Sequence, residues 1–271
     1  MVSSPADICG KDPASEFLSD KIRLLSVPTK QNTNALEATT SMKIIGLIGG
    51  MSWESSQTYY QVINETVRDR LGGLHSARCI LYSVDFAEIE VLQQEGRWEE
   101  AAALLVEAGR SLEHAGAGCI VLCTNTMHKV AEQIEASVSI PLLHIADAAA
   151  GQICTQGIHS VGLLGTRFTM EEDFYKSRLV ERYGLQVLIP PPEERATVHQ
   201  VIYNELCLGQ IRDESREAYR RIIAGLVERG AQGVILGCTE IGLLVKPADS
   251  PVPLFDTTLL HAQMAVDWSI G

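Results

Sequence analysis

The chain alternates between short, continuous apolar runs and longer stretches in which apolar residues recur every three or four positions. Continuous runs are typical of strands buried on both faces of a parallel sheet, and the longer spacing is typical of amphipathic helices. Strands are expected at residues 43–49, 78–84, 119–123, 140–145, 160–164, 185–189, 233–237 and 252–256. This alternation predicts an α/β protein.

Helices are expected between most of these strands. Ser52 or Ser55 is a candidate N-cap for a helix that stops at Gly72-Gly73. Residues 85–88 form either a loop or the start of a short helix. Further helices are expected at residues 98–114, from about 126, after 145, at 169–183, around 198–206, at 214–229 and at 258–268. We expect the last of these to pack across onto the first half of the chain.

Three segments of the first half recur in the same order in the second half. They begin at Gly46 and Gly162, at Ile120 and Val234, and at Ile140 and Val252, with separations of 116, 114 and 112 residues. This repetition predicts two homologous, pseudo-symmetric lobes. Each lobe is expected to be Rossmann-like, with a parallel four-stranded sheet flanked by helices and with its ligand edge at the carboxyl ends of the strands. The active site is then expected in the cleft between the lobes.

The proposed division of the chain follows from this repeat. The first lobe comprises residues 42–147 together with 258–271, and the second comprises residues 148–257. Residues 1–41 are polar and show no sustained hydrophobic period, so we expect a disordered N-terminal extension, with a short helix conceivable near residues 14–25.

Composition narrows the classes of partner and compartment. Apolar residues make up 46% of the chain and charged residues 21%, and the formal net charge of −12 argues against nucleic acid or an anionic membrane as a partner. No apolar run reaches the roughly 18 residues of a membrane span. Seven cysteines without a disulfide-like spacing are typical of the reducing cytoplasm. A small molecule is therefore the expected partner.

Two strand ends carry the candidate chemistry. Residues 233–237 lead into Cys238, and residues 119–123 lead into Thr124. The internal repeat aligns Thr124, rather than Cys123, with Cys238. Because neighbouring strand residues point to opposite faces, Cys123 is expected to point away from the cleft.

Two such groups on opposite faces of a cleft suit a reaction in which a proton leaves one face of a carbon atom and returns to the other. A thiolate is an effective base where amide dipoles and a helix N-terminus lower the thiol pKa, and Cys238 is expected to stand at such a place. A buried structural cysteine is the alternative role for this residue.

Several motifs resemble one family. They are Gly49-Gly50-Met51-Ser52, Thr124-Asn125-Thr126-Met127-His128, Leu164-Gly165-Thr166 and Gly237-Cys238-Thr239-Glu240. In this order they resemble the cofactor-independent aspartate/glutamate racemase family, over about residues 42–270. Within this family the chain is most similar to the bacterial L-aspartate/glutamate-specific type, through Trp53-Glu54-Ser55, His75-Ser76-Ala77, Ser83-Val84-Asp85-Phe86 and Asn204-Glu205-Leu206-Cys207-Leu208-Gly209. The resemblance implies an isomerase with no metal and no other cofactor, a dicarboxylic amino acid as substrate, and a homodimer.

The first motif departs from the family pattern. The family carries Cys-Asn-Thr in the first lobe, where this chain has Thr124-Asn125-Thr126. A hydroxyl is a much weaker acid than a thiol and is no stored base near neutral pH. We therefore expect Cys238 and Thr124 to form an asymmetric catalytic pair, with one antipode as the better substrate and with Thr124 relaying a proton to or from water, or from His128. The resemblance implies that L enantiomers are the substrates converted.

The other candidate site residues follow by position or by resemblance. Met51 lies on a glycine turn whose amides suit a carboxylate, while Asn125, Thr126 and Thr239 offer donors beside the catalytic positions. The resemblance adds Gln93 and Glu205 as substrate contacts. A surface position is equally open for Gln93. Thr166 is a candidate N-cap of the following helix, and this structural role alone would explain it. Arg167 is a candidate to bind the distal carboxylate of the substrate, and a solvent-exposed loop arginine is the alternative.

The sequence thus predicts racemisation of aspartate or glutamate. Two alternatives stay open: a single-cysteine decarboxylase or isomerase of a small dicarboxylic acid, and an amino-acid-binding protein without turnover. No glycine pattern of a dinucleotide site is present.

Overall fold

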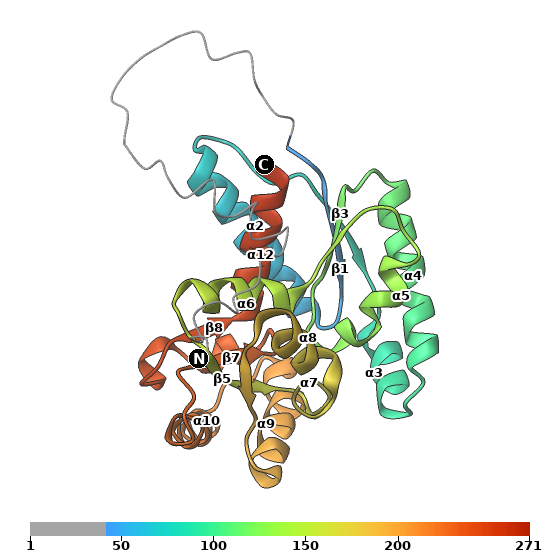
Figure 1. Cartoon of the computed structure of the whole chain (residues 1–271). Coiled ribbons are helices and arrows are strands. Elements are labelled where there is room, and N and C mark those ends of the chain that lie inside the picture. Colours follow the sequence, from blue (N-terminus) through green and yellow to red (C-terminus); the bar gives the residue numbers. More distant parts are fainter. Residues whose placement is uncertain (1–41) are drawn as a thin grey trace, which may run out of the picture.

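In a computed structural model of the chain, residues 42–271 are described (Figure 1). The disorder and the short helix considered for the N-terminal extension lie outside the described residues.

The described chain contains two parallel four-stranded sheets. The first has the order β2-β1-β3-β4 and the second the order β6-β5-β7-β8, so the two lobes share one topology. The strands are β1 (Ile45–Gly49), β2 (Cys79–Ser83), β3 (Cys119–Leu122), β4 (Leu142–Leu143), β5 (Ser160–Gly165), β6 (Gln186–Leu188), β7 (Gly233–Gly237) and β8 (Leu254–Asp256). The predicted fold class is confirmed.

The strand register repeats between the sheets. Ile120 of β3 pairs with Leu142 of β4, and Val234 of β7 pairs with Leu254 of β8. These are equivalent positions of the internal repeat. The sequence similarity between the two halves therefore reflects equivalent places in two copies of one architecture.

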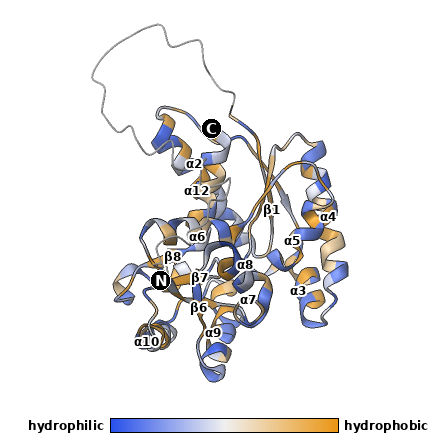
Figure 2. Cartoon of the chain, viewed as in Figure 1, coloured by the Kyte–Doolittle hydropathy of each residue, from blue (hydrophilic) through white to orange (hydrophobic). Residues whose placement is uncertain are grey.

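Helices cover both faces of each sheet. In the first lobe they are α2 (Trp53–Leu71), α3 (Phe86–Gln94), α4 (Trp98–His114), η2 (Thr126–Val130) and α5 (Ala131–Glu135). In the second they are α7 (Arg167–Glu171), α8 (Asp173–Tyr183), α9 (Pro192–Asn204), η3 (Leu206–Leu208), α10 (Asp213–Glu228), α11 (Ile241–Leu244) and η4 (Pro247–Asp249). Figure 2 shows hydrophobic strands inside helices whose outer sides are largely hydrophilic. No helix in residues 42–271 is long and apolar enough to cross a membrane.

Two helices cross between the lobes. Helix α6 (Ile145–Thr155) follows the first sheet, but Ala149 and Ile153 pack with Leu163 and Ile235 of the second sheet. Helix α12 (Thr257–Ile270) follows the second sheet, but it packs against α2 and the first sheet (Figure 1). Each lobe therefore completes its core with a helix from the other, which fixes the lobes against each other.

Several element boundaries differ from the sequence prediction, three of them for a clear local reason. The helix expected at residues 169–183 is two helices, because Glu172 is extended with ψ 160°. Helix α9 starts at Pro192 rather than near 198, since proline suits the first helical turn. The strand expected at 140–145 shortens to β4 because His144 caps α6, its side chain accepting a hydrogen bond from the Ala146 amide.

Candidate active site

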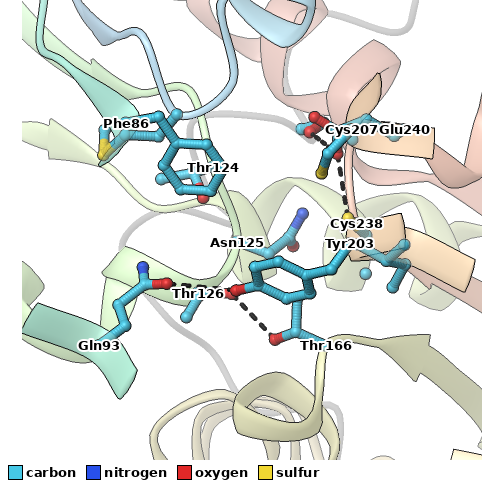
Figure 3. Close-up of a pocket in the computed structure, with 14 residues that line it drawn as sticks. Phe86, Gln93, Thr124, Asn125, Thr126, Thr166, Tyr203, Cys207, Cys238 and Glu240 are labelled. Atoms are coloured by element: carbon cyan, nitrogen blue, oxygen red, sulfur yellow. Dashed lines mark hydrogen bonds between the residues drawn. The ribbon is translucent and has the colours of Figure 1, made fainter. Parts of the chain in front are cut away.

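One pocket lies where the carboxyl ends of β1, β3, β5 and β7 meet (Figure 3). Both lobes contribute to its lining, which consists of Met51, Phe86, Gln93, Thr124, Asn125, Thr126, Thr166, Ile202, Tyr203, Cys207, Gly237, Cys238, Thr239 and Glu240. The cavity volume is about 20 Å³, the space of a water molecule or two. An amino acid therefore enters only if the lining side chains move apart.

The turn after β1 brings Met51 to the pocket. Gly50 has φ +93°, and a Cβ atom there would lie 2.2 Å from the Val84 carbonyl oxygen, so only glycine fits. The Gly50 amide donates to the Ser56 hydroxyl over 2.8 Å. Ser52 caps α2 by accepting from the Ser55 amide. Met51 lines the pocket, and its contact with a substrate stays a prediction.

At the end of β3, the structure separates Thr124 from Cys123. Thr124 lines the pocket, whereas Cys123 is fully buried behind the sheet with Val121 and Ala262. The Cys123 thiol donates weakly to the Val121 carbonyl at 3.8 Å. The predicted register is confirmed.

His128 does not reach the Thr124 hydroxyl. Its Nδ1 lies 2.8 Å from the Thr124 carbonyl oxygen, and its Nε2 accepts from the Ile145 amide at 3.2 Å. Burial, followed by neighbouring His144 and His261, lowers its pKa well below the usual value, so the ring is neutral. The suggestion that Thr124 relays a proton from His128 is wrong, because backbone groups occupy both ring nitrogens.

Cys238 stands in the pocket wall, with its Sγ 3.0 Å from Oε2 of Glu240. Burial, followed by the Glu240 carboxylate, raises the thiol pKa well above its usual value, although the Glu240 backbone amide opposes this. The expected lowering by backbone dipoles is wrong for this arrangement. In the structure, Cys238 is a protonated thiol that donates a hydrogen bond.

Glu240 links this thiol to both lobes. Its Oε2 also accepts from the Thr239 hydroxyl at 2.6 Å, and its Oε1 accepts from the Ser52 hydroxyl of the first lobe at 2.7 Å. Thr239 lines the pocket as predicted, but its hydroxyl hydrogen is directed at Glu240. Its value as a substrate donor therefore depends on breaking that bond.

Neutral polar side chains of both lobes also line the pocket. The Thr126 and Thr166 hydroxyls lie 2.9 Å apart across the lobes, and Thr166 also caps α7 through the Thr169 amide. Asn125 donates to the Thr257 hydroxyl, while its buried Oδ1 has no hydrogen-bond partner. An acceptor thus remains available in the pocket wall.

Gln93 is buried in the pocket rather than on the surface. Its Oε1 accepts from the Tyr203 hydroxyl at 3.2 Å, and this bond joins α3 of the first lobe to α9 of the second. Its amide nitrogen lies 3.0 Å from the Met127 sulfur. The surface alternative for Gln93 is wrong, and the residue is placed to contact whatever occupies the cavity.

Two other candidates lie outside the pocket lining. Glu205 accepts from the Ser215 hydroxyl at 2.6 Å and lies 3.6 Å from the Arg212 guanidinium. Arg167 lines a separate outer cavity together with His199 and Tyr203. The structure does not bring either residue to the side chains around Cys238, and the substrate contact proposed for Glu205 stays a prediction.

Sequence reasoning gave no role to several lining residues, among them Glu240, Tyr203 and Cys207. Glu240 directly follows the Cys238-Thr239 pair, and that adjacency was its available signal. Tyr203 is in α9 and Cys207 in η3, with the non-helical Glu205 between them, so no helical spacing in the sequence marked them as neighbours.

Two α/β lobes of one topology, meeting around a pocket with equivalent strand ends, define a two-lobed α/β enzyme with its site at the lobe junction. The chain belongs to the Asp/Glu/Hydantoin racemase family, whose profile matches residues 48–265.

Several known proteins are similar to it. A Yersinia pestis structure, provisionally assigned as an Asp/Glu racemase, is 59% identical with a TM-score of 0.80, covering 85% of this chain and all of that one. An aspartate racemase homologue from Pyrococcus horikoshii OT3 is 35% identical with a TM-score of 0.74, covering 84% and 99% of the two chains. The broad specificity amino-acid racemase RacX of Bacillus subtilis is 24% identical over 62% of this chain and 72% of its own.

Proposed function

We propose that this protein racemises aspartate, glutamate or both at the α-carbon, with Cys238 and Thr124 acting on opposite faces of the substrate. The observation that carries the proposal is that these residues, at the equivalent ends of β7 and β3, line the same pocket from different lobes (Figure 3). Inversion at a stereocentre requires proton transfer on both faces of one carbon, and this placement supplies two faces.

The two sides differ in chemistry. Cys238 is a thiol beside a carboxylate, whereas the Thr124 hydroxyl has no charged neighbour among the residues lining the pocket on its own lobe. We assign proton abstraction from the L enantiomer to Cys238. Return of a proton on the other face is assigned to water held by Thr124. The resemblance to the L-aspartate/glutamate-specific type favours L to D as the direction of conversion.

Binding of a dicarboxylic amino acid relies on neutral donors in this pocket. No lysine or arginine is found among the described residues that line it, and Glu240 supplies a negative charge. That charge suits the substrate ammonium group. The amides of the Met51 turn, Asn125 and Thr126 suit the α-carboxylate, and Gln93 with Tyr203 suits the distal group once the pocket opens.

The direct test is proton exchange in deuterium oxide. Purified protein is incubated with each enantiomer of aspartate and glutamate, and α-proton loss and optical inversion are followed separately. We expect exchange and inversion from the L enantiomers to exceed those from the D enantiomers. Asparagine and glutamine are the matched neutral substrates. Background exchange with all four acids would contradict the proposal, and release of carbon dioxide would indicate a decarboxylase instead.

A further inference from the structure

The outer cavity beside Arg167 is much larger than the inner pocket around Cys238. Helix α3 of the first lobe lines one side of it, and α7 with α9 of the second lobe lines the other. Its volume is about 350 Å³, against about 20 Å³ for the inner pocket. Sites that bind small molecules are typically about 300–1,000 Å³ in volume. The outer cavity therefore has room for an amino acid as it stands, which the inner pocket does not.

One hydrogen-bonded pair separates the two cavities. Tyr203 lines both of them, and its hydroxyl donates to Oε1 of Gln93, which lines the inner pocket (Figure 3). Glu90 and Gln94, on the same helix as Gln93, line the outer cavity. The bond between Tyr203 and Gln93 therefore stands at the boundary between the cavities. Passage from one cavity to the other requires this bond to break.

The outer cavity carries both signs of charge. Glu90 contributes a carboxylate from the first lobe, and Arg167 contributes a guanidinium from the second. Arg167 is exposed, its guanidinium lies 5.3 Å from the centre of the Phe168 ring, and it forms no ion pair within residues 42–271. No lysine or arginine of the same part of the chain lines the inner pocket. An anionic substrate thus meets a cation in the outer cavity and none further in.

His199 adds a hydrogen-bond donor beside Arg167. Its Nδ1 accepts from the Arg167 backbone amide at 3.3 Å. Burial, followed by the Arg167 charge, lowers the pKa of His199, although Glu171 opposes this. The ring is therefore neutral near pH 7 and carries its proton on Nε2. The cavity wall thus offers a guanidinium and a ring N–H, both of which suit a carboxylate.

We propose that the outer cavity is a second binding site for a dicarboxylic amino acid, from which the substrate passes between Tyr203 and Gln93 to the inner pocket. This inference rests on the proposed function. An amino acid carries an ammonium group and carboxylates, so it pairs with both charges of the cavity at once.

Each charged group of the ligand has a partner in the outer cavity. One carboxylate binds at the Arg167 guanidinium and the His199 Nε2–H, and the ammonium group binds at the Glu90 carboxylate. These partners take no part in proton transfer, because Cys238 and Thr124 lie in the inner pocket. They set the efficiency of capture, which contributes to kcat/KM and not to kcat.

The first test is Arg167→Gln, which removes the cation from the cavity. We expect kcat/KM for L-aspartate and L-glutamate to fall about tenfold while kcat changes less than about twofold, because only capture is weakened. Added salt should lower kcat/KM of the wild type toward that of the variant. Arg221→Gln, at an exposed position of α10 outside both cavities, removes the same charge and is expected to behave as wild type. An unchanged kcat/KM in Arg167→Gln, or a fall in kcat as large as that in kcat/KM, would overturn the proposal.

The second test blocks the cavity. Gln200→Trp places a large ring there from an exposed position of α9. We expect kcat/KM to fall at least about tenfold with little change in kcat. Gln152→Trp, exposed on α6 and outside the cavity lining, is the matched control. Equal kinetics in the two variants would mean that substrate reaches the inner pocket by another route, which is incompatible with the proposal.

A third measurement needs no turnover. Equilibrium dialysis of Cys238→Ala with radiolabelled L-glutamate counts the molecules bound per chain at saturation. We expect two in Cys238→Ala and one when Gln200→Trp is added, because the tryptophan fills the outer cavity. One molecule in both proteins would reject the outer site even if racemisation occurs. Two molecules and one, together with background α-proton exchange in the wild type, would reject the proposed function and leave the outer site standing.

Discussion

The end of β3 and the end of β7 occupy equivalent places in the two lobes but carry different chemistry. Thr124 follows β3 and carries a hydroxyl, and His128 bonds to the backbone carbonyl of Thr124 rather than to this hydroxyl. Cys238 follows β7 with a thiol that donates to a buried carboxylate. The sheets around them have the same order and register.

The two lobes therefore share one fold but present different functional groups at equivalent positions. The duplicated fold still presents two strand ends to one pocket, but only the second lobe carries a thiol there, which is a stronger acid than the Thr124 hydroxyl. Under the proposed function, this asymmetry predicts that the two directions of racemisation differ in rate.

The largest effect is expected for Cys238→Ala. Loss of a positioned acid/base group typically costs about 10²–10⁴ in rate, and here the base is removed outright, so we expect the upper end. The measurement is α-proton exchange from L-aspartate and L-glutamate. Cys123→Ala, behind the sheet, is the control and is expected to keep its activity with a stability loss of about 1 kcal/mol. An active Cys238→Ala with an inactive Cys123→Ala would reverse the assignment.

The second effect concerns the opposite side of the pocket. Thr124→Val keeps the shape and removes the hydroxyl, and we expect kcat to fall about 10²-fold. Thr124→Cys supplies a second thiol and is expected to raise the D to L rate relative to L to D. Both directions are measured by optical inversion. Thr197→Val, an exposed hydroxyl on α9, serves as control. A wild-type rate in Thr124→Val, with equal exchange into both antipodes, would refute the role of the hydroxyl.

The third prediction concerns the pH dependence of stability, which we expect to arise from three buried histidines near the helices that cross between the lobes. His128 lies with its ring 4.4 Å from that of His144 and 5.8 Å from that of His261. Burial lowers the pKa of His144 to about 2 and that of His261 to about 4. Below the unfolded value of about 6.5, the unfolded chain binds protons that the native state does not.

The free energy of unfolding is therefore expected to fall as pH drops from about 6.5 toward 4, by up to about 1.4 kcal/mol per pH unit for each histidine. His144→Asn keeps an acceptor for the Ala146 amide and removes one titrating group. The free energy of unfolding, measured with urea at several pH values, should change less steeply with pH in this variant, by the equivalent of about one proton. An unchanged slope would mean that His144 is protonated in the native state.

The smallest effect is expected for Tyr203→Phe. The change removes one neutral hydrogen bond between the lobes, from Tyr203 to Gln93, which contributes about 0.5–1.5 kcal/mol. Since this bond joins two residues that line the pocket from different lobes, we expect KM to change several-fold and kcat to change little. Steady-state kinetics with L-glutamate measures both. A loss of kcat beyond about 10²-fold would instead place the Tyr203 hydroxyl in the chemical step.

The sequence predicted the eight strands because buried parallel strands have an unmistakable apolar pattern. It also predicted the register at Cys123 and Thr124, since adjacent strand residues must face opposite sides. It did not predict the break at Glu172 or the early start of α9, both of which depend on local backbone geometry within helical stretches. Boundaries are set by contacts that periodicity does not encode.

In the site, too, the sequence predicted the positions of residues better than their protonation and contacts. Thr124, Asn125, Thr126 and Cys238 were found because they follow predicted strands. The pKa of Cys238 was expected to be lowered, and this was wrong because burial and the side chain of Glu240 outweigh the backbone dipoles. His128 was given a proton-transfer role that its backbone contacts prevent.

The sequence by itself determined two lobes of one fold and the asymmetric pair at their strand ends, because strand periodicity and an internal repeat are properties of the chain alone. Only the tertiary structure decided the protonation of that pair. Ser52 and Glu240 are 188 residues apart, yet their side chains meet at 2.7 Å beside Cys238. Charge and burial at a site arise from segments distant in sequence, and these meet only when the chain has folded.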